Sequence, residues 1–388
     1  MVILLQSACT TTMTRRNIEG PVDVDKSLTE IPENRLLNAS IEVFDPGVLP
    51  ENPKDANGLS LDIRKAEARY MPEQLRTTME KTGYWGAVRV VPRGVTEGEL
   101  MVSGTIMESN GEQLDLDITA RDASGRQWFS KQYRDAVDAA FYQENGANSE
   151  AFQPLYNTIA NDLARFLRSL PTSEITNIRR IAELRFAADI APDAYAGYLQ
   201  RDDNGEYKVV HLPSSDDPMF QRVLAIQERD LLMIDTLNGH FENFHREMKV
   251  PYTEWRKSRS DEAEKQRLLE KQALNRTLLG VASIVGAIFV GAASDRNNRG
   301  LGTLSDVMVL GGAAALKSGM DKRSEASIHR DSVEELGSSF SSEARPLVIE
   351  VEGKTIELTG SAEAQYQQWR ALMGQIYVAE TGLPQASD

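Results

Sequence analysis

The chain has 388 residues, 41% of them apolar, which suggests two or three domains with hydrophobic cores and is too few apolar residues for a polytopic membrane protein. The formal net charge of −15 argues against binding of nucleic acid, which needs clustered Lys and Arg, and against broad adhesion to anionic lipid headgroups. A single cysteine excludes an internal disulfide and a thiolate metal cluster.

That cysteine, Cys9, follows a short apolar segment, residues 2–5, and precedes a polar run. An apolar segment followed by Ser-Ala-Cys is typical of the end of a bacterial lipoprotein signal, where the cysteine becomes the new N-terminus and carries the lipid. The pattern departs from such signals, because no basic residue precedes the segment and Gln6 stands where Leu is usual. The alternative is a chance cysteine in a frayed terminus. We predict lipidation at Cys9, and Thr10, in place of the Asp that marks inner-membrane retention, favours the outer membrane.

Residues 10–38 are polar with scattered Pro and Gly, and they predict a tether between the signal remnant, residues 1–9, and the first domain. Regular structure is expected from Ala39, where ASIEVF alternates apolar and polar residues as a half-buried strand does. A helix follows from Leu61. We expect Pro72 to start a second helical piece rather than continue the first.

Four strands are expected next, at residues 87–92, 100–108, 113–121 and 127–134. Asn110-Gly111 predicts a tight two-residue hairpin turn between the second and the third. In the third strand, apolar residues alternate with Asp115, Asp117, Thr119 and Arg121, which predicts one buried face and one wet face. An amphipathic helix over residues 152–166 completes the predicted α/β domain, residues 39–171.

This order of elements resembles the periplasmic domain of envelope lipoproteins, namely the curli-secretion channel lipoprotein and the peptidoglycan-synthase activator lipoproteins. The resemblance covers residues 39–170 and depends on the phrases PEQLRTTMEKTGYWGAVRVVP, ELMVSGTIMESNG and LDLDITARDASGRQWFSKQY. Gly104 and Ile106 occupy the strand pattern apolar-x-Gly-x-Ile of that group. The resemblance implies a periplasmic domain that makes subunit contacts or regulates an envelope enzyme. This sequence shows no long amphipathic β-hairpins of the kind that build the curli channel's barrel.

Residues 172–276 predict a helical bundle and a stalk. A long helical region begins near Pro218, and its apolar residues recur at spacings of three and four, as in a bundle core. Those residues are Leu231, Ile234, Leu237, Phe241, Phe244 and Met248. We expect Pro251 to interrupt the helix, and residues 254–276, which are mostly charged or polar, to form a solvated stalk.

Residues 277–319 predict a glycine-rich apolar helical hairpin. Its first arm, TLLGVASIVGAIFVGAA, carries no charge and spans roughly 25 Å at 1.5 Å per residue, slightly short of a hydrocarbon core of about 30 Å. Small side chains let helices approach closely. The predicted helix-packing residues are Gly280, Ser283, Gly286, Ala287, Gly291, Gly311 and Gly312. The sequence leaves open whether this hairpin contacts the membrane or is buried in an oligomer.

Residues 320–388 predict a helix, a small β-hairpin and a last helix. No side-chain pattern in the sequence indicates catalysis, a cofactor or a metal. His240 and His245 are five residues apart, about 140° around a helix, whereas a metal pair needs a spacing of four. Asp115 and Asp117 could mimic paired acids, but their alternation with leucines favours the wet side of a sheet.

We therefore expect an α+β protein: an N-terminal α/β domain with an antiparallel meander sheet, a long helical region with a glycine-rich helical hairpin, and a C-terminal β-hairpin plus helix. The leading hypothesis is a non-enzymatic outer-membrane lipoprotein, on the periplasmic face, that forms a homo-oligomer such as a ring or pore and serves secretion or assembly. Its expected partners are its own copies, the membrane and other envelope proteins, without nucleic acid. The alternative is a monomeric periplasmic module that regulates an envelope enzyme such as a peptidoglycan synthase; an enzyme of undetected type is a third hypothesis.

Overall fold

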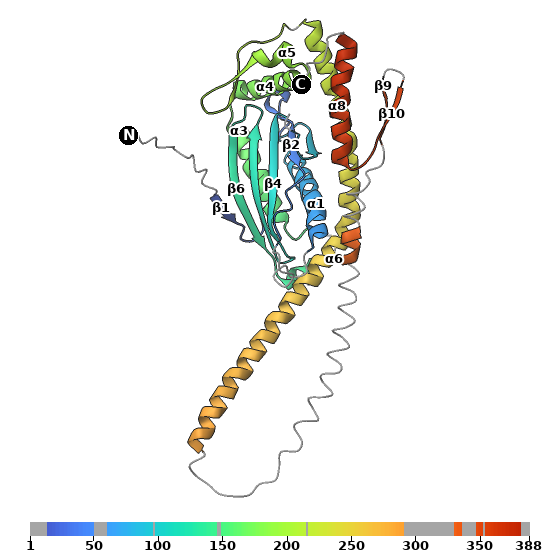
Figure 1. Cartoon of the computed structure of the whole chain (residues 1–388). Coiled ribbons are helices and arrows are strands. Elements are labelled where there is room, and N and C mark those ends of the chain that lie inside the picture. The colour runs from blue at the N-terminus through green and yellow to red at the C-terminus, as the bar shows by residue number, and fades with distance from the viewer. Residues whose placement is uncertain are drawn as a thin grey trace, which may run out of the picture.

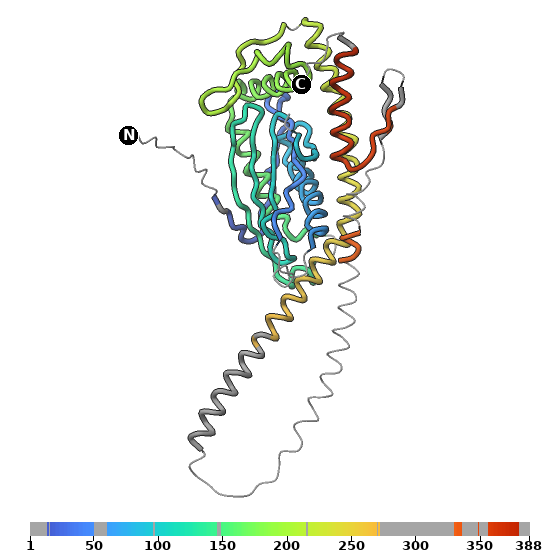
Figure 2. Tube along the Cα trace, viewed as in Figure 1, coloured from blue at the N-terminus to red at the C-terminus, as the bar shows by residue number. Residues whose placement is uncertain are grey.

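The computed structural model describes residues 14–49, 60–95, 98–145, 149–214, 216–290, 330–335, 347–351 and 354–381. It is an α+β protein, as predicted (Figure 1). A six-stranded sheet with helices on one face forms a body that we call the head, residues 14–170. One very long helix passes along the head and continues beyond it, as the chain trace in Figure 2 shows.

The sheet of the head is mixed, with the order β1-β6-β5-β4-β2-β3. Its central part, β4-β5-β6, is the predicted antiparallel meander, but β2 pairs in parallel with both β3 and β4, and β1 pairs in parallel with β6. The strands are β1 (Thr14–Asn17), β2 (Ala39–Glu42), β3 (Val88–Val91), β4 (Leu100–Ser109), β5 (Gln113–Asp122) and β6 (Gln127–Ala136).

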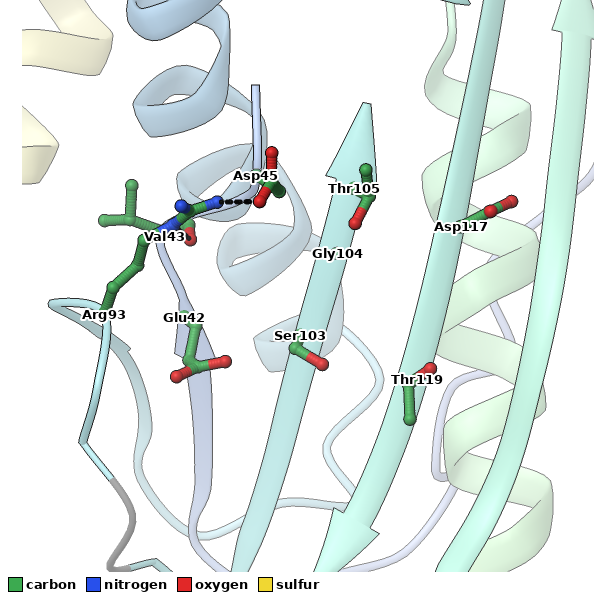
Figure 3. Close-up of a pocket in the computed structure, with 9 residues that line it drawn as sticks. All are labelled: Glu42, Val43, Asp45, Arg93, Ser103, Gly104, Thr105, Asp117 and Thr119. Carbon is green, nitrogen blue, oxygen red and sulfur yellow. Dashed lines mark hydrogen bonds and ion pairs between the residues drawn. The ribbon is translucent and has the colours of Figure 1, made fainter. Parts of the chain in front are cut away.

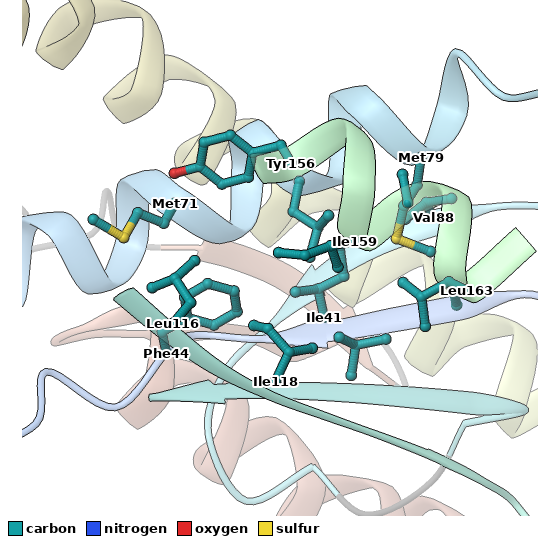
Figure 4. Packing of buried hydrophobic residues seen from close by; sticks show 14 of the residues in the cluster. Ile41, Phe44, Met71, Met79, Val88, Leu116, Ile118, Tyr156, Ile159 and Leu163 are labelled. Carbon is teal, nitrogen blue, oxygen red and sulfur yellow. The ribbon is translucent and has the colours of Figure 1, made fainter. Parts of the chain in front are cut away.

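The core of the head lies between this sheet and helices α1 (Leu61–Glu80) and α3 (Gln153–Ser169), with the short α2 (Ala139–Asn145) beside them. Figure 4 shows how aliphatic side chains of β2 and β5 meet those of the two helices. The predicted inward residues of β5 are buried in this cluster; they are Leu114, Leu116, Ile118 and Ala120.

Two predictions about the β4–β5 hairpin were wrong. The connection contains three residues, 110–112, rather than two, and the Asn110 side chain accepts hydrogen bonds from the backbone N–H groups of Glu112 and Gln113. Asp115 is not on a wet face but is 2% exposed. The Arg134 side chain on the neighbouring strand lies over it, with Nε 2.8 Å from Asp115 Oδ1, because the two residues are paired in register.

Helix α1 runs without a break through Pro72, contrary to the expectation of two pieces. Proline cannot donate to the carbonyl four residues earlier, which is that of Ala68. The backbone N–H of Phe44, in the chain after β2, donates to this oxygen at 2.9 Å instead. The proline therefore does not end the helix. It leaves the Ala68 carbonyl oxygen without a donor inside the helix, and the bond from Phe44 links α1 to the chain that follows β2.

Gly104 and Ile106 lie in β4, on the face that packs against the helices. A Cβ atom on Gly104 would lie 2.7 Å from the ring of Phe44, which is completely buried. The glycine is thus required by close packing of an aromatic ring, not by an unusual backbone angle.

The interpretation of residues 10–38 as a tether is wrong from residue 14 onward. β1 extends the sheet, and the segment after it is bonded to α3 by side-chain amides: Asn161 Nδ2 donates to Asp23 O at 2.9 Å, and Asn157 Nδ2 to Val22 O at 2.7 Å. Low hydrophobicity concealed this packing, because hydrogen bonds from the amides of α3 hold much of the segment, in addition to the apolar contacts of Ile18 and Leu37.

The remaining elements cover one end and one edge of the head. They are α4 (Thr172–Ile190), α5 (Pro192–Tyr195), the pair β7 (Leu199–Arg201) and β8 (Tyr207–Val209), α6 (Pro218–Val290), the hairpin β9 (Leu347–Val351) and β10 (Lys354–Leu358), and α8 (Ala362–Thr381). Residues 330–335 are also helical. α4 and α6 contribute side chains to the same core cluster as the sheet, so the predicted boundary at residue 171 does not separate two cores.

Helix α6 begins at Pro218 as predicted, but it continues through Pro251, which we expected to interrupt it. Tyr252 and Trp255, directly after this proline, are each 1% exposed against the head, and their burial holds the helix in line. Of the predicted apolar seam, five residues are buried, whereas Leu231 is 36% exposed.

Candidate functional site

Buried polar groups of α6 and the head meet in the region where α6 leaves the head. Nearer its N-terminus, α6 covers the edge of the sheet at β3. Asn238 Oδ1 accepts a hydrogen bond from the backbone N–H of Val90 at 2.7 Å, and Arg89 Nε donates to Asp235 at 2.6 Å. A helix side chain thereby satisfies a backbone donor that an edge strand would leave open.

Further along α6, His245 stacks on the ring of Tyr70 from α1, with ring centroids 4.3 Å apart, and its Nε2 lies 3.1 Å from Gln74 Oε1. Burial lowers the pKa of His245 to about 4, so the ring is neutral at physiological pH. The ring therefore packs against α1.

Next, α6 inserts a hydroxyl into the core. Tyr252 donates to Glu67 Oε1 at 2.7 Å, and Ser109 of β4 donates to the same oxygen at 2.5 Å. Arg64 Nε lies 3.2 Å from the other Glu67 oxygen. Burial raises the pKa of Glu67, and the neighbouring guanidinium and hydroxyls oppose that rise. Three separate elements therefore meet at one buried carboxyl group.

The next contact along α6 is a buried ion pair. Arg256 donates to both oxygens of Glu150, with Nη1–Oε1 at 2.7 Å and Nη2–Oε2 at 3.0 Å, and the side chains are 1% and 7% exposed. Burial alone would raise the pKa of Glu150, but the Arg256 cation outweighs it and the pKa lies below its usual value. The Arg256 guanidinium also lies over the ring of Tyr252, 4.2 Å from its centroid.

The turn between β4 and β5 also contacts α6. A Cβ on Gly111, where φ is +91°, would lie 2.7 Å from the carbonyl oxygen of Arg256, so only glycine allows the turn to approach α6 this closely. Glu112 accepts a hydrogen bond from Ser260 at 3.1 Å and two from Arg267, at 2.6 and 2.7 Å. We call the contacts of Tyr252, Arg256, Ser260 and Arg267 with the head the junction.

Beyond the junction, α6 no longer touches the body of the head (Figure 1). Residues 268–290, which we call the arm, extend for about 35 Å at 1.5 Å per residue. Leu268 and Leu269 at its start are 50% and 66% exposed. Of the helices in the described part of the chain, none has the length and apolarity required to span a bilayer.

The predicted helix-packing residues divide between two parts of the chain. Gly280, Ser283, Gly286 and Ala287 lie on the backbone of α6, as expected for the first arm of the predicted hairpin. Gly291, Gly311 and Gly312, and the predicted lipidation site Cys9, lie outside the described residues.

A second polar site is a groove of about 410 Å³ on the sheet face that α1 and α3 leave open (Figure 3). Glu42 and Asp45 at the end of β2, Arg93, and side chains of β4 and β5 line it. Arg93 Nη2 lies 3.0 Å from Asp45 Oδ2. Asp117, predicted for the wet face, lines the groove with the hydroxyls of Ser103, Thr105 and Thr119.

The carboxyl groups of this groove are in different environments. Burial raises the pKa of Glu42, whereas a hydrogen bond from the backbone N–H of Gly47 lowers that of Asp45, together with the Arg93 cation. Such a surface can bind polar groups through hydroxyls and carboxylates. The described residues include no cluster of three His, Cys, Asp or Glu side chains suited to a metal ion.

Sequence reasoning missed the junction. Arg256 stands in the stretch 254–276 that was predicted to be a solvated stalk, Tyr252 follows the proline that was expected to interrupt the helix, and Glu67 and Glu150 are far away in the chain. One signal was available: Tyr252, Trp255 and Arg256 follow the apolar seam at helical spacing, which continues its buried face.

No family model, curated protein or solved structure matches this chain. The resemblance to the envelope lipoproteins therefore depends on the order of elements and on the phrases that carry it.

Proposed function

We propose that this chain is a non-enzymatic, lipid-anchored envelope protein that assembles with copies of itself, and that α6 is a rigid arm for this assembly. The single observation that carries the proposal is the junction. A helix that served only to complete the core of the head would need to extend no further than Ser260, the last buried residue among the α6 side chains that the structure describes. Instead α6 is fixed to the head by buried bonds and then continues to Val290.

The sequence of the arm supports this role. From Thr277 to Val290 it has no charged residue, and its small residues recur on one helical face. A helix that is apolar all round is normally buried against other helices or lipid. In our proposal, arms of neighbouring copies pack through these small residues, while Cys9 carries the acyl groups at the outer membrane.

The decisive measurement is the mass of particles extracted from membranes with mild detergent. Several copies per particle support the proposal, and a monomer overturns it. Gly286→Leu places a bulky side chain on the small face of the arm and should dissociate the particles. Lys265→Leu, at an exposed position of the same helix, is the matched control and should leave them intact. Cys9→Ser should release the protein from membranes, and full retention of this variant would contradict the lipid anchor.

The second candidate is a monomeric module that binds and regulates an envelope enzyme. The groove on the open face of the sheet favours it, because its hydroxyls and carboxylates are suited to a polar partner. The double substitution Thr105→Val and Thr119→Val, which keeps the side-chain volume, should weaken such a partner and leave the particle mass unchanged. The two candidates therefore respond to different substitutions.

A further inference from the structure

The β1 edge of the sheet gathers three cationic side chains around one carboxylate. Asp162 of α3, whose side chain is 1% exposed, lies 2.7 Å from Arg16, 3.0 Å from Lys131 and 2.7 Å from Arg165, and it accepts a hydrogen bond from Tyr133 at 3.0 Å. One carboxylate offsets one cation, so two positive charges are left. The three cationic side chains are 44%, 29% and 62% exposed, which keeps part of their donor groups in contact with solvent.

The chain enters the head at this same edge. β1 begins at Thr14, so only residues 10–13 separate it from Cys9. Five residue steps of at most about 3.6 Å span roughly 18 Å. Acyl groups on Cys9 would therefore hold this edge near the lipid headgroups, whereas a tether reaching to residue 38 would have left the head free to turn.

We propose that the β1 edge, with Arg16, Lys131 and Arg165, faces the membrane and binds the phosphates of anionic lipid headgroups. The proposed orientation depends on the proposed lipid anchor, whereas the binding of headgroups by the three cationic side chains does not. The net charge of −15 does not prevent this contact, because screening limits the reach of a charge to about 8 Å at physiological ionic strength.

The cationic area is small. Backbone atoms of Asp23 and Asp25 are bonded to Asn161, directly before Asp162 on α3, so carboxylates follow the cations along this edge. The contact should therefore be weak without the acyl groups and should decrease steeply with salt.

The orientation can be measured directly, because the chain has no cysteine other than Cys9. In the acylated protein on vesicles, a fluorophore on Thr14→Cys at the β1 edge should transfer energy strongly to an acceptor on the lipid headgroups. The same fluorophore on Val348→Cys, in β9 on the opposite side of the head and 64% exposed, should transfer little (Figure 1). Equal transfer from the two positions would overturn the proposed orientation.

The charge cluster is tested without the anchor. The Cys9→Ser chain should bind vesicles of phosphatidylglycerol mixed with phosphatidylcholine at low salt, and Arg16→Gln or Arg165→Gln should each weaken this about fivefold, since a surface cation contributes about 1 kcal/mol. Arg246→Gln, on α6 and 68% exposed, is the matched control and should have no effect. Equal binding to pure phosphatidylcholine would overturn the headgroup contact. This binding test uses a chain without acyl groups, so its result does not depend on whether Cys9 is lipidated. The headgroup contact and the lipid anchor are therefore tested separately.

Discussion

Replacing Arg256 with alanine tests whether the junction holds α6 on the head. The substitution removes the cation and leaves the Glu150 carboxylate buried, with hydrogen bonds only from the Phe152 N–H at 3.3 Å and the Tyr70 hydroxyl at 3.2 Å. Breaking a buried ion pair in this way costs about 3–5 kcal/mol, and the lost contact with the ring of Tyr252 adds about 1 kcal/mol. Because the two remaining bonds offset part of this, we expect the free energy of unfolding to decrease by about 3–4 kcal/mol.

Urea unfolding followed by tryptophan fluorescence measures this change, since Trp255 lies beside the pair and is 1% exposed. The double variant Glu150→Leu with Arg256→Met removes both charges and should cost less than the single substitution, because no unpaired charge stays buried. Arg246→Ala, an exposed pair with Glu242, should cost at most about 0.5 kcal/mol. A loss below about 1 kcal/mol for Arg256→Ala, which is the range of surface pairs, would refute the reasoning.

Three further substitutions test separate contacts of the fold. Burial raises the pKa of Asp135 from 3.8 to about 6, so as pH rises through this window the wild type should lose about 1–2 kcal/mol more stability than Asp135→Asn, after allowance for solvent screening. Gly104→Ala forces a methyl group against Phe44 and should cost about 1–3 kcal/mol in urea unfolding. Asn238→Ala leaves the Val90 N–H without its acceptor and should cost about 1–3 kcal/mol.

Each of these has a control. Urea midpoints of wild type and Asp135→Asn that move in parallel across the pH window would contradict the assignment to that carboxyl group. Gly197→Ala, where an added Cβ would meet nothing within 4 Å, should be nearly neutral, and an equal loss at both glycines would argue against the packing explanation. Asn238→Asp keeps the acceptor oxygen; if it behaves like alanine, the hydrogen bond to β3 is not what Asn238 contributes.

The parts of the fold that the sequence predicted are those with a local periodic signal. The alternation in β5 marked the inward residues correctly, and spacings of three and four marked five of the six seam residues of α6. Leu231 is exposed because the adjacent Asp230, 5% exposed, is buried instead and accepts a hydrogen bond from Trp369 of α8. The position of a helix that far away in the chain is not encoded in local spacing.

The incorrect predictions share one cause, which is that a distant segment supplies what the local sequence lacks. Pro72 leaves a carbonyl open, and Phe44 bonds to it. The alternation in β5 predicted a solvated Asp115, but Arg134, its register partner on β6, lies over it. The polar stretch after β1 looks like a linker because its partners are the amides of α3. The candidate site depends on the same kind of contact and was therefore not predictable from motifs.

The junction also imposes an order on folding. The partner of Glu150 lies 106 residues later in the chain, and that of Glu67 lies 185 residues later. During synthesis, the sheet and α1 can form before α6 has emerged, but until then Glu67 and Glu150 lack their partners on α6. A fragment that ends at residue 170 would keep two acidic side chains in an incomplete core. Such a fragment should be loosely packed, and one that extends past Arg267 should regain a cooperative transition.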